Sequence, residues 1–304
     1  MESKNVIDIK NLTKSFKDVK AVDNLSFQVR RGDLFAFLGV NGAGKSTTIN
    51  ILANIIQKDG GEVLINGVKI EQRPDDSKRE IGIVFQSSVL DSAMCVYDNL
   101  KFRAALYGIV GAEFEKRIAE LSETLDFASY LSRPVGKLSG GQKRRVDIAR
   151  AIFHKPEILI LDEPTTGLDP QTRRLLWNVI SELRKNENLT VLLTTHYMEE
   201  AANADYVVII DDGKIAAEGT PIELKNKYTN DFLTLYGKDE VPFTDCAQEK
   251  VVGGIRISVP STKAVTEMIL KNPELFVDYE VVKGRMDDVF LAVTGKSLKE
   301  EKEK

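Results

Sequence analysis

The sequence predicts an α/β protein with a mostly parallel central sheet, followed by a smaller α+β domain. Short apolar runs at 34–38 and 158–161 have the composition of strands that are covered on both faces of such a sheet. Apolar residues at helical spacing follow the first run, so strand, loop and helix succeed one another. At 304 residues the chain is long for one domain, and its composition changes after Thr229.

The composition is ordinary for a soluble protein with a sizeable core, with 42% apolar and 29% charged residues. The net charge of −4 is too mild to indicate a nucleic-acid-binding protein. Cys95 and Cys246 have no paired spacing, so we expect a reducing compartment and no structural metal. Residues 1–10 lack the apolar core of a signal peptide, and no apolar run approaches the roughly 20 residues that cross a bilayer. A membrane role would therefore need a membrane-spanning partner.

The first part of the chain predicts mainly strands. Short strands are expected at 6–9, 25–29, 34–38, 62–65 and 81–85. Asn66-Gly67 is typical of a hairpin turn after the fourth of these strands. Phe16 lies between the first two strands, where spacing alone favours a core aromatic. Gln86 directly follows the last strand, where a polar residue is either an ordinary loop residue or a ligand.

A candidate phosphate-binding loop separates strand 34–38 from the next helix. Its residues fit the pattern G-x-x-x-x-G-K-[ST] and are Gly39, Val40, Asn41, Gly42, Ala43, Gly44, Lys45, Ser46 and Thr47. Glycines let successive N–H groups turn toward one phosphate, and the helix N-terminus adds its positive dipole. We expect Lys45 to reach the β- and γ-phosphates and the Ser46 hydroxyl to bind Mg²⁺. The alternative is a glycine-rich turn that binds nothing.

The pattern becomes helical after Val96, which predicts an inserted helical subdomain over about 96–137. We expect four basic side chains to form its solvated face: Lys101, Arg103, Lys116 and Arg117.

Another helix should begin at Ser139, because Ser139 and Gln142 form the S-x-x-Q capping box. Gly140 and Gly141 are unfavourable at a helix start unless something approaches the backbone closely, and an anion at that N-terminus would be a reason. We expect the basic run 143–145 to be solvated helix surface.

Asp162 and Glu163 stand at the carboxyl end of strand 158–161, where ligands bind in open α/β sheets. Asp162 would hold the Mg²⁺ shell, and Glu163 could orient and deprotonate an attacking water. The alternative is a pair of exposed acids that open a turn before Pro164.

His196 follows the last residue of a predicted buried strand at 190–195. A lone histidine is more often structural, but this one falls at the same sheet edge as Asp162, Glu163 and Gln86, which favours a functional role. His154 has no such position, and we expect it only to pack or cap.

The next segments are marked by their turns and caps. Asp169 precedes Pro170, which is well placed in the first turn of a helix. Asp212-Gly213 indicates a hairpin, and Thr220 begins a short helix with a capping box.

The end of the chain predicts a small α+β appendage at 229–296 after a main domain at 1–228, with a charged tail at 297–304. Strands are expected at 251–259 and 276–282, and helices at 262–270 and 286–293.

Taken together, the motifs resemble those of the nucleotide-binding subunit of an ATP-binding cassette (ABC) transporter, whose fold is a P-loop NTPase cassette. The resemblance covers roughly residues 6–224. Leu138 to Gln142 matches the family signature LSGGQ letter for letter, and this signature is far more specific than a phosphate-binding loop. Val40 stands where proline is usual, on the outer turn of the loop, where only its backbone should matter.

The resemblance implies roles for residues at matching positions. Gln86 resembles the glutamine that touches Mg²⁺ and the attacking water, Asp162 the metal-binding aspartate and Glu163 the catalytic base. Asp169 matches an aspartate of the dimer interface, and His196 the histidine that contacts the γ-phosphate. The cofactors implied are ATP and Mg²⁺. Phe16 resembles the aromatic that stacks on adenine. It replaces the commoner tyrosine and still provides a ring for stacking.

The resemblance also implies partners. A second copy of the chain, or a homologous ATPase subunit, would pair with it head to tail, so that two ATP molecules lie between the subunits. The residues expected to face the ATP of the other subunit are Ser139, Gly140, Gly141 and Gln142. The segment from Gln86 to Leu100 would dock short helices of membrane-spanning permease subunits, at the cytoplasmic face of the plasma membrane.

The ending at 286–295 is similar to the EDVFL-x-x-TG ending of ATPases from bacterial ABC-2-type exporters, including the daunorubicin-resistance kind, which implies export. The alternative function is a soluble ABC-type ATPase that acts as a regulator or on nucleic acid or the ribosome. The chain has neither a second signature nor a coiled coil, and its mild acidity also disfavours nucleic acid as a partner.

Overall fold

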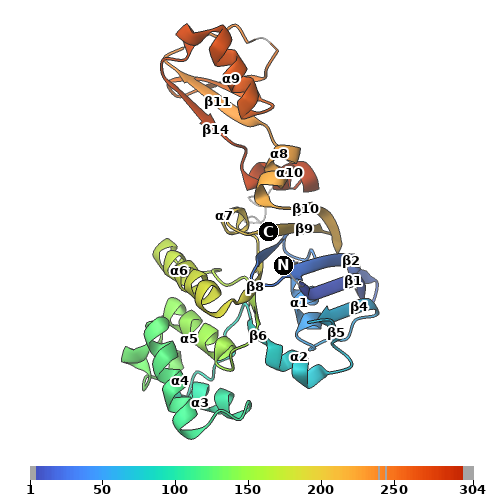
Figure 1. The fold of residues 1–304 in the computed structure, drawn as a ribbon, viewed down its shortest axis with the longest axis vertical. Coiled ribbons are helices and arrows are strands. Elements are labelled where there is room, and N and C mark those ends of the chain that lie inside the picture. Colours follow the sequence, from blue (N-terminus) through green and yellow to red (C-terminus); the bar gives the residue numbers. More distant parts are fainter. Residues whose placement is uncertain (1–4, 239, 244, 297–304) are drawn as a thin grey trace.

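The computed structural model describes residues 5–238, 240–243 and 245–296, so the predicted charged tail lies outside the described residues. A six-stranded sheet forms the centre of the larger body, in the order β10-β9-β3-β8-β7-β6 (Figure 1). Its strands are β3 (Leu34–Leu38), β6 (Ile81–Val84), β7 (Ile158–Asp162), β8 (Thr190–Thr195), β9 (Tyr206–Asp211) and β10 (Lys214–Gly219). Neighbouring strands are parallel except for the β9–β10 hairpin, which confirms the predicted mostly parallel sheet.

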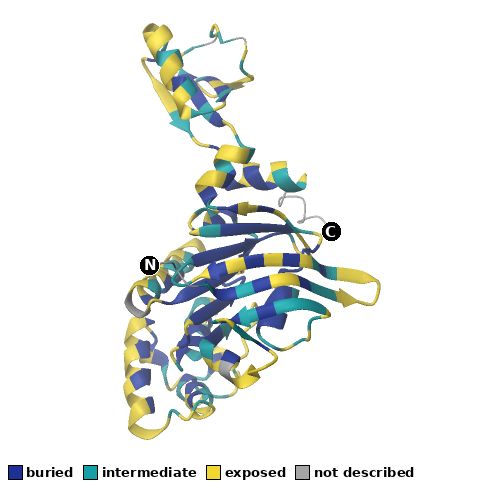
Figure 2. Ribbon diagram, turned by 45° about the vertical axis from the view of Figure 1, so that its right-hand side comes forward, coloured by how far each residue is buried: buried dark blue, intermediate teal, exposed yellow. Residues whose placement is uncertain are grey.

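Both faces of this sheet are covered, which explains the uniformly apolar strands. On one face, Phe35 and Phe37 pack into a core shared with an antiparallel sheet and with α1 (Lys45–Leu52). That sheet has the order β2-β1-β4-β5, and its strands are β1 (Asn5–Phe16), β2 (Val19–Arg30), β4 (Gly60–Ile65) and β5 (Val68–Lys69). Figure 2 shows the difference between the layers, since strands of the antiparallel sheet alternate between buried and exposed residues. The predicted hairpin turn at Asn66-Gly67 is confirmed.

Helices on the other side of the sheet form the second, larger core, in which Ala36 and Leu38 of β3 also lie. These helices are α3 (Val96–Ala105), α4 (Gly111–Thr124), α5 (Gly140–Ile152), α6 (Pro170–Glu187) and α7 (Met198–Ala202), with 3₁₀ turns at Ala128–Tyr130 and Val135–Lys137; α2 (Pro74–Glu80) precedes β6. In the part of the chain that the structure describes, no helix combines the length and apolarity needed to cross a membrane.

The expectation that Arg117 is solvated was wrong. Arg117 is buried, and its guanidinium donates to the carbonyls of Ile152 (3.0 Å) and Phe153 (3.4 Å) at the end of α5. The last carbonyls of a helix have no partner within the helix, so a long cationic side chain from α4 is well suited to satisfy them.

The appendage is an antiparallel sheet in the order β12-β13-β11-β14, with one helix packed on it. Its elements are β11 (Asp231–Tyr236), β12 (Gln248–Val251), β13 (Gly254–Val259), α9 (Thr262–Lys271), a 3₁₀ turn at Pro273–Leu275 and β14 (Tyr279–Val282). The single strand predicted at 251–259 was wrong, because Gly253 adopts a φ of 82° and turns the chain into a hairpin. The last strand also begins later than predicted, after the 3₁₀ turn.

The closing helix α10 (Met286–Thr294) lies beside α8 (Pro221–Tyr228), between the appendage and the larger body (Figure 1). Met286, Val289 and Phe290 belong to the larger core and not to the appendage core. The division of the chain at 228/229 stays a prediction, and α10 returns to the body that precedes it.

Candidate active site

The predicted phosphate-binding loop connects β3 to α1. Gly42 and Gly44 have φ angles of 82° and 106°, in the left-handed region that glycine adopts most easily. A side chain at Gly44 would also collide with the backbone carbonyl of Ala21. Asn41 and Gly42 are exposed, so the backbone at the loop tip is open to a ligand. The loop conformation is therefore compatible with the phosphate cradle that the motif predicts.

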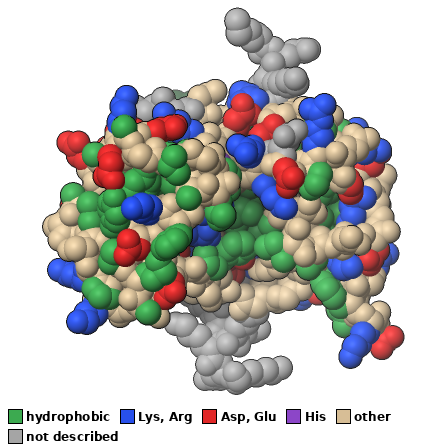
Figure 3. Space-filling model, turned by 90° about the horizontal axis from the view of Figure 1, so that it is seen from below, with side chains coloured by type: hydrophobic (Ala, Val, Ile, Leu, Met, Phe, Trp, Pro, Cys, Tyr) green, Lys and Arg blue, Asp and Glu red, His purple; other side chains and the backbone are tan. Residues whose placement is uncertain are grey.

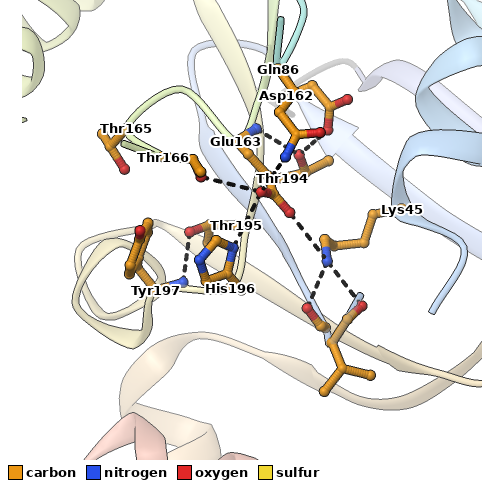
Figure 4. Close-up of polar contacts among 12 residues, drawn as sticks. Lys45, Gln86, Asp162, Glu163, Thr165, Thr166, Thr194, Thr195, His196 and Tyr197 are labelled. Carbon is orange, nitrogen blue, oxygen red and sulfur yellow. Dashed lines mark hydrogen bonds and ion pairs between the residues drawn. The ribbon is translucent and has the colours of Figure 1, made fainter. Parts of the chain in front are cut away.

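Lys45 is buried, with 4% of its surface exposed, and its ammonium group points back into the loop. Nζ donates to the carbonyl oxygens of Gly39 (2.7 Å) and Val40 (3.0 Å). The side chain of Val40 also packs against both cores of the larger body, so the expectation that only its backbone matters was wrong. The same Nζ lies 3.7 Å from Oε1 of Glu163 (Figure 4). A desolvated cation between carbonyls and a carboxylate is well prepared to exchange them for phosphate oxygens.

Glu163 is the point at which the predicted catalytic side chains meet (Figure 4). Its Oε2 accepts hydrogen bonds from Nε2 of Gln86 (3.1 Å) and Oγ1 of Thr166 (3.2 Å). Nδ1 of His196 lies 3.3 Å from the same oxygen. His196 beside the carboxyl lowers the pKa of Glu163, and Lys45 acts in the same direction. The carboxylate therefore stays ionised, as a general base must be.

Asp162 is buried at the end of β7, where Oγ1 of Thr194 donates to its Oδ1 at 2.5 Å. Burial raises the pKa of Asp162, and the like charge of Glu163 adds to this, while the Ser46 hydroxyl lowers it. A divalent cation would favour the ionised form. Ser46, Gln86 and Asp162 offer hard oxygen donors, which fit Mg²⁺.

Among the residues described, no group of three or more His, Cys, Asp or Glu side chains could hold a metal ion. Mg²⁺ is commonly bound through one or two carboxylates together with substrate phosphates and water, and not in an all-protein cage. The Asp162 carboxylate with the Ser46 hydroxyl beside the phosphate loop is a donor set of this kind.

Two residues that hold this site were not predicted as part of it. Thr194 donates to Asp162 and accepts from the backbone N–H of Glu163 through both Oγ1 (3.0 Å) and its carbonyl oxygen (3.1 Å). A hydroxyl directly after the apolar middle of the strand at 191–193, and two residues before His196, was the available signal. The second is Arg144, which was expected to be solvated within 143–145 but is buried, with 7% exposed. Its position four residues before buried Ile148 was the available signal.

The signature segment forms the predicted capping box at the start of α5, with the Ser139 hydroxyl accepting from the Gln142 N–H and the Gln142 side chain accepting from the Ser139 N–H. Ser139 and Gly140 are exposed at the tip of α5. Asp169 caps α6 and accepts from the hydroxyl of Thr172 at 2.5 Å. A Cβ on Gly141 would lie 2.5 Å from Cγ2 of the same threonine. The Thr172 side chain is therefore the group that approaches the backbone of this glycine closely.

Phe16 is 47% exposed at the end of β1, so the interpretation as a core aromatic was wrong. Phe16 pairs with Val19 across the β1–β2 turn. Two residues after Val19, the carbonyl of Ala21 adjoins Gly44 of the phosphate loop. The ammonium of Lys14 lies 5.4 Å from the centre of the ring. An exposed ring on the hairpin that adjoins the loop at Ala21 is suited to stacking on a base.

Comparisons with known proteins agree with these motifs. Residues 22–166 match the family model described as ABC transporter. The chain is 33% identical to Nod factor export ATP-binding protein I of Cupriavidus pinatubonensis, over 97% of this chain and 92% of that protein. It is also 33% identical to doxorubicin resistance ATP-binding protein DrrA of Mycobacterium tuberculosis, over 91% of this chain and 89% of that protein.

A solved structure extends the likeness to the fold. It is a dimeric structure of the ATP-binding cassette MJ0796 in a post-hydrolysis state, bound to ADP and Pi. It has a TM-score of 0.65 and 28% sequence identity, covering 71% of this chain and 98% of that one.

Proposed function

The chain belongs to the ABC transporter family, and on that premise we propose that it is the ATP-binding and ATP-hydrolysing subunit of an exporter. Closure of two such subunits around ATP would drive transport through a separate membrane permease. The observation that carries this proposal is the convergence of Lys45, Gln86 and His196 on the Glu163 carboxylate beside the phosphate loop.

In the proposed reaction, ATP and water yield ADP and phosphate. The loop backbone and Lys45 bind the phosphates and offset their negative charge. Glu163 accepts the proton of the attacking water, and Gln86 and His196 orient that water and the γ-phosphate. Ser46 and Asp162, with Gln86, would hold Mg²⁺, which would supply positive charge to offset that of the phosphates. Phe16 stacks on the adenine.

The site is completed by a second ATPase subunit. The exposed tip of α5 presents Ser139 and Gly140 to a neighbouring molecule, and Gly141 and Gln142 follow in its first turn. A phosphate held by Lys45 of one subunit would then be bound by the helix N-terminus of the other. Asp169, exposed at the start of α6, would lie at the same interface. The solved dimeric cassette supports this arrangement.

The proposed permease partner has a suitable docking place. A cavity of about 220 Å³ lies between α2 and β6 on one side and α3 and α5 on the other, with Ile55, Phe85 and Tyr107 in its lining. It adjoins the segment from Gln86 to Leu100. Figure 3, which views the molecule from below, shows apolar side chains gathered in a hollow at the centre of this face. Bound there, the chain would sit at the cytoplasmic face of the plasma membrane. No observation favours the alternative function on nucleic acid or the ribosome.

The proposal is tested by Mg²⁺-dependent ATP hydrolysis with the full chain. Lys45→Ala should lose most of its ATP affinity, because the buried ammonium no longer meets the β- and γ-phosphates. Lys227→Ala removes an exposed lysine from α8 and should bind ATP as the unchanged chain does. Unchanged ATP binding by Lys45→Ala in calorimetry, or no hydrolysis by the unchanged chain, would contradict the proposal.

A further inference from the structure

Within the described part of the chain, the hydrogen bonds of Arg144 go to backbone carbonyl oxygens that border the candidate site. Its Nε donates to Pro164 (2.7 Å) and its Nη1 to Phe85 (2.6 Å). Its Nη2 donates to Glu163 (3.0 Å) and Gln86 (3.4 Å). One buried guanidinium on α5 therefore joins the chain after β6 to the chain after β7. The rigid fork of five N–H donors makes arginine suited to several acceptors at once, which lysine is not.

A second side chain on the same face of α5 contacts the same segment. Asp147 lies three residues after Arg144, and its Oδ1 accepts from the hydroxyl of Ser88 at 3.1 Å. Both Arg144 and Asp147 are buried. Helix α5 thus holds the segment 85–88 at two points, and any shift of Gln86 must be shared with the helix.

The backbone at Glu163 explains why such a hold matters. Glu163 has a φ of 45°, in the left-handed region that non-glycine residues adopt only when their surroundings enforce it. Thr194 holds the N–H of Glu163 from one side. Arg144 holds the carbonyl of Glu163 and that of Pro164 from the other side. The direction of the Glu163 carboxylate depends on this conformation.

We propose that Arg144 is a positioning residue that links the two ATP sites of the proposed dimer. It fixes Gln86 and Glu163 in the site of its own subunit, and it stands on the helix whose tip, Ser139, completes the site of the other subunit. ATP that moves Gln86 and Glu163 in one site would thereby reorient the helix tip in the other. The inference rests on the proposed function, since it needs ATP turnover in a dimer.

The first test compares Arg144→Gln with Arg145→Gln in the full chain. Arg145 is the next residue of the same helix and forms an ion pair at the surface with Asp126. Arg144→Gln should lower kcat by about tenfold or more, because misplacing a catalytic group is costly even when the change lies outside the site. Its KM should change by less than about threefold, since ATP is bound mainly by the loop and Lys45. Arg145→Gln should leave both parameters nearly unchanged.

Added guanidinium provides the readout that a merely structural role would not give. Millimolar guanidinium should restore part of the kcat of Arg144→Ala and leave the kcat of Arg145→Ala unchanged. Methylammonium, which lacks the planar fork, should not restore the kcat of Arg144→Ala. If Arg144→Ala or Arg144→Gln does not fold, Arg144→Lys keeps the charge and most of the volume, and its kcat should still fall.

The link between sites has its own measurement. In the Glu163→Gln background, Arg144→Gln should raise the ATP concentration needed for half-maximal dimer formation, while nucleotide binding to the monomer stays the same. A folded Arg144 variant with kcat and dimerisation within about twofold of the unchanged residue would overturn the inference. If the unchanged chain hydrolyses no ATP, the proposed function fails instead, so the two failures are distinguishable.

Discussion

Glu163 and His154 show how the surroundings of single residues decide what their charges can do. Contacts with His196 and Lys45 lower the pKa of Glu163, which keeps the proposed base ionised. His154 stacks on Tyr107, with ring centres 3.9 Å apart and planes inclined by 8°. Burial, with Arg103 acting in the same direction, lowers the pKa of His154 to about 4. His154 thus packs as expected, and it carries no charge at neutral pH.

The stability of the protein should therefore depend on His154 in mild acid. The pKa is about 6.5 in the unfolded chain and about 4 in the folded protein, so between these values only the unfolded chain takes up the proton. Stability should fall as the pH is lowered through this window, and His154 should have no such effect above it. His154→Phe keeps a ring beside Tyr107 but cannot titrate. Urea unfolding from pH 7 to pH 4.5 should show the unchanged chain losing stability relative to this variant, and parallel curves would contradict the assignment.

For single residues, the sequence predicted which side chains form the site better than it predicted which side chains are buried. The phosphate loop and the residues Asp162, Glu163 and His196 are marked by motif and by position after a strand, so their convergence could be expected. The burial of Arg117 could not, because carbonyl acceptors on distant segments have no sequence signature. For Arg144 the helical spacing to Ile148 indicated burial, but its carbonyl partners had no signature either. Phe16 was assigned to the core by spacing, although strand spacing does not show where a hairpin runs past the sheet it packs on.

Among the helices, α5 and α6 approach each other closely, and Gly141 makes this possible. A Cβ there would lie 2.5 Å from Cγ2 of Thr172, whose hydroxyl is held by the Asp169 carboxylate. At Gly140 the nearest atom would be a methyl group of Leu168 at 3.8 Å, an ordinary contact. The two signature glycines therefore have different neighbours within the chain.

Gly141→Ala should therefore destabilise the protein by about 1–3 kcal/mol, because overpacking forces α5 and α6 apart. Gly140→Ala is the matched control and should have little effect or a small stabilising one. Thr172→Ser removes the methyl group and keeps the hydroxyl, so it should recover much of the loss in the double variant. Urea unfolding of the unchanged chain, Gly141→Ala, Thr172→Ser and the double variant measures this coupling. Equal stability of Gly141→Ala and the control Gly140→Ala would show that the close approach does not matter.

Most elements were predicted with nearly correct bounds where caps and turns are explicit, as at Ser139, Thr220 and Asn66-Gly67. Errors occur in both bodies. In the larger body the strands predicted at 6–9 and 25–29 are the much longer β1 and β2, and α2 was not predicted. Other errors lie in the appendage, where signals are weaker. Alternating residues at 251–259 predict one strand, yet Gly253 provides the left-handed turn that makes two. The strand β11 was not predicted at all, because its residues follow the end of α8 with no turn motif between them.

In the whole molecule, the appendage is an insertion between α8 and α10 (Figure 1). Gly284 packs directly against Thr229, so the chain leaves and re-enters the larger body at neighbouring points. Three apolar side chains of α10, Met286, Val289 and Phe290, are each at most 2% exposed in the larger core. Sequence reasoning grouped α10 with the appendage because contacts across such an insertion leave no local pattern.

Two deletions should therefore behave differently. Removing residues 231–283 and joining Asn230 to Gly284 keeps α10 in place, and the protein should retain ATP binding and hydrolysis. Ending the chain at Thr229 removes α10 and exposes the apolar surface beneath it, at about 1.5–3 kcal/mol for each large apolar side chain lost. Thermal melting and ATP hydrolysis would compare the two. A truncated chain as stable as the internal deletion would contradict the packing of α10.

The proposed two-subunit ATP site is tested most directly by the oligomeric state of Glu163→Gln. This variant lacks the proposed base but keeps the phosphate loop, Lys45 and the exposed Ser139 tip, so it should bind ATP without consuming it. Light scattering should then show a dimer with ATP and Mg²⁺, and a monomer with ADP or when Ser139→Arg is added to block the tip. A monomer at saturating ATP, with binding verified by calorimetry, would contradict the account.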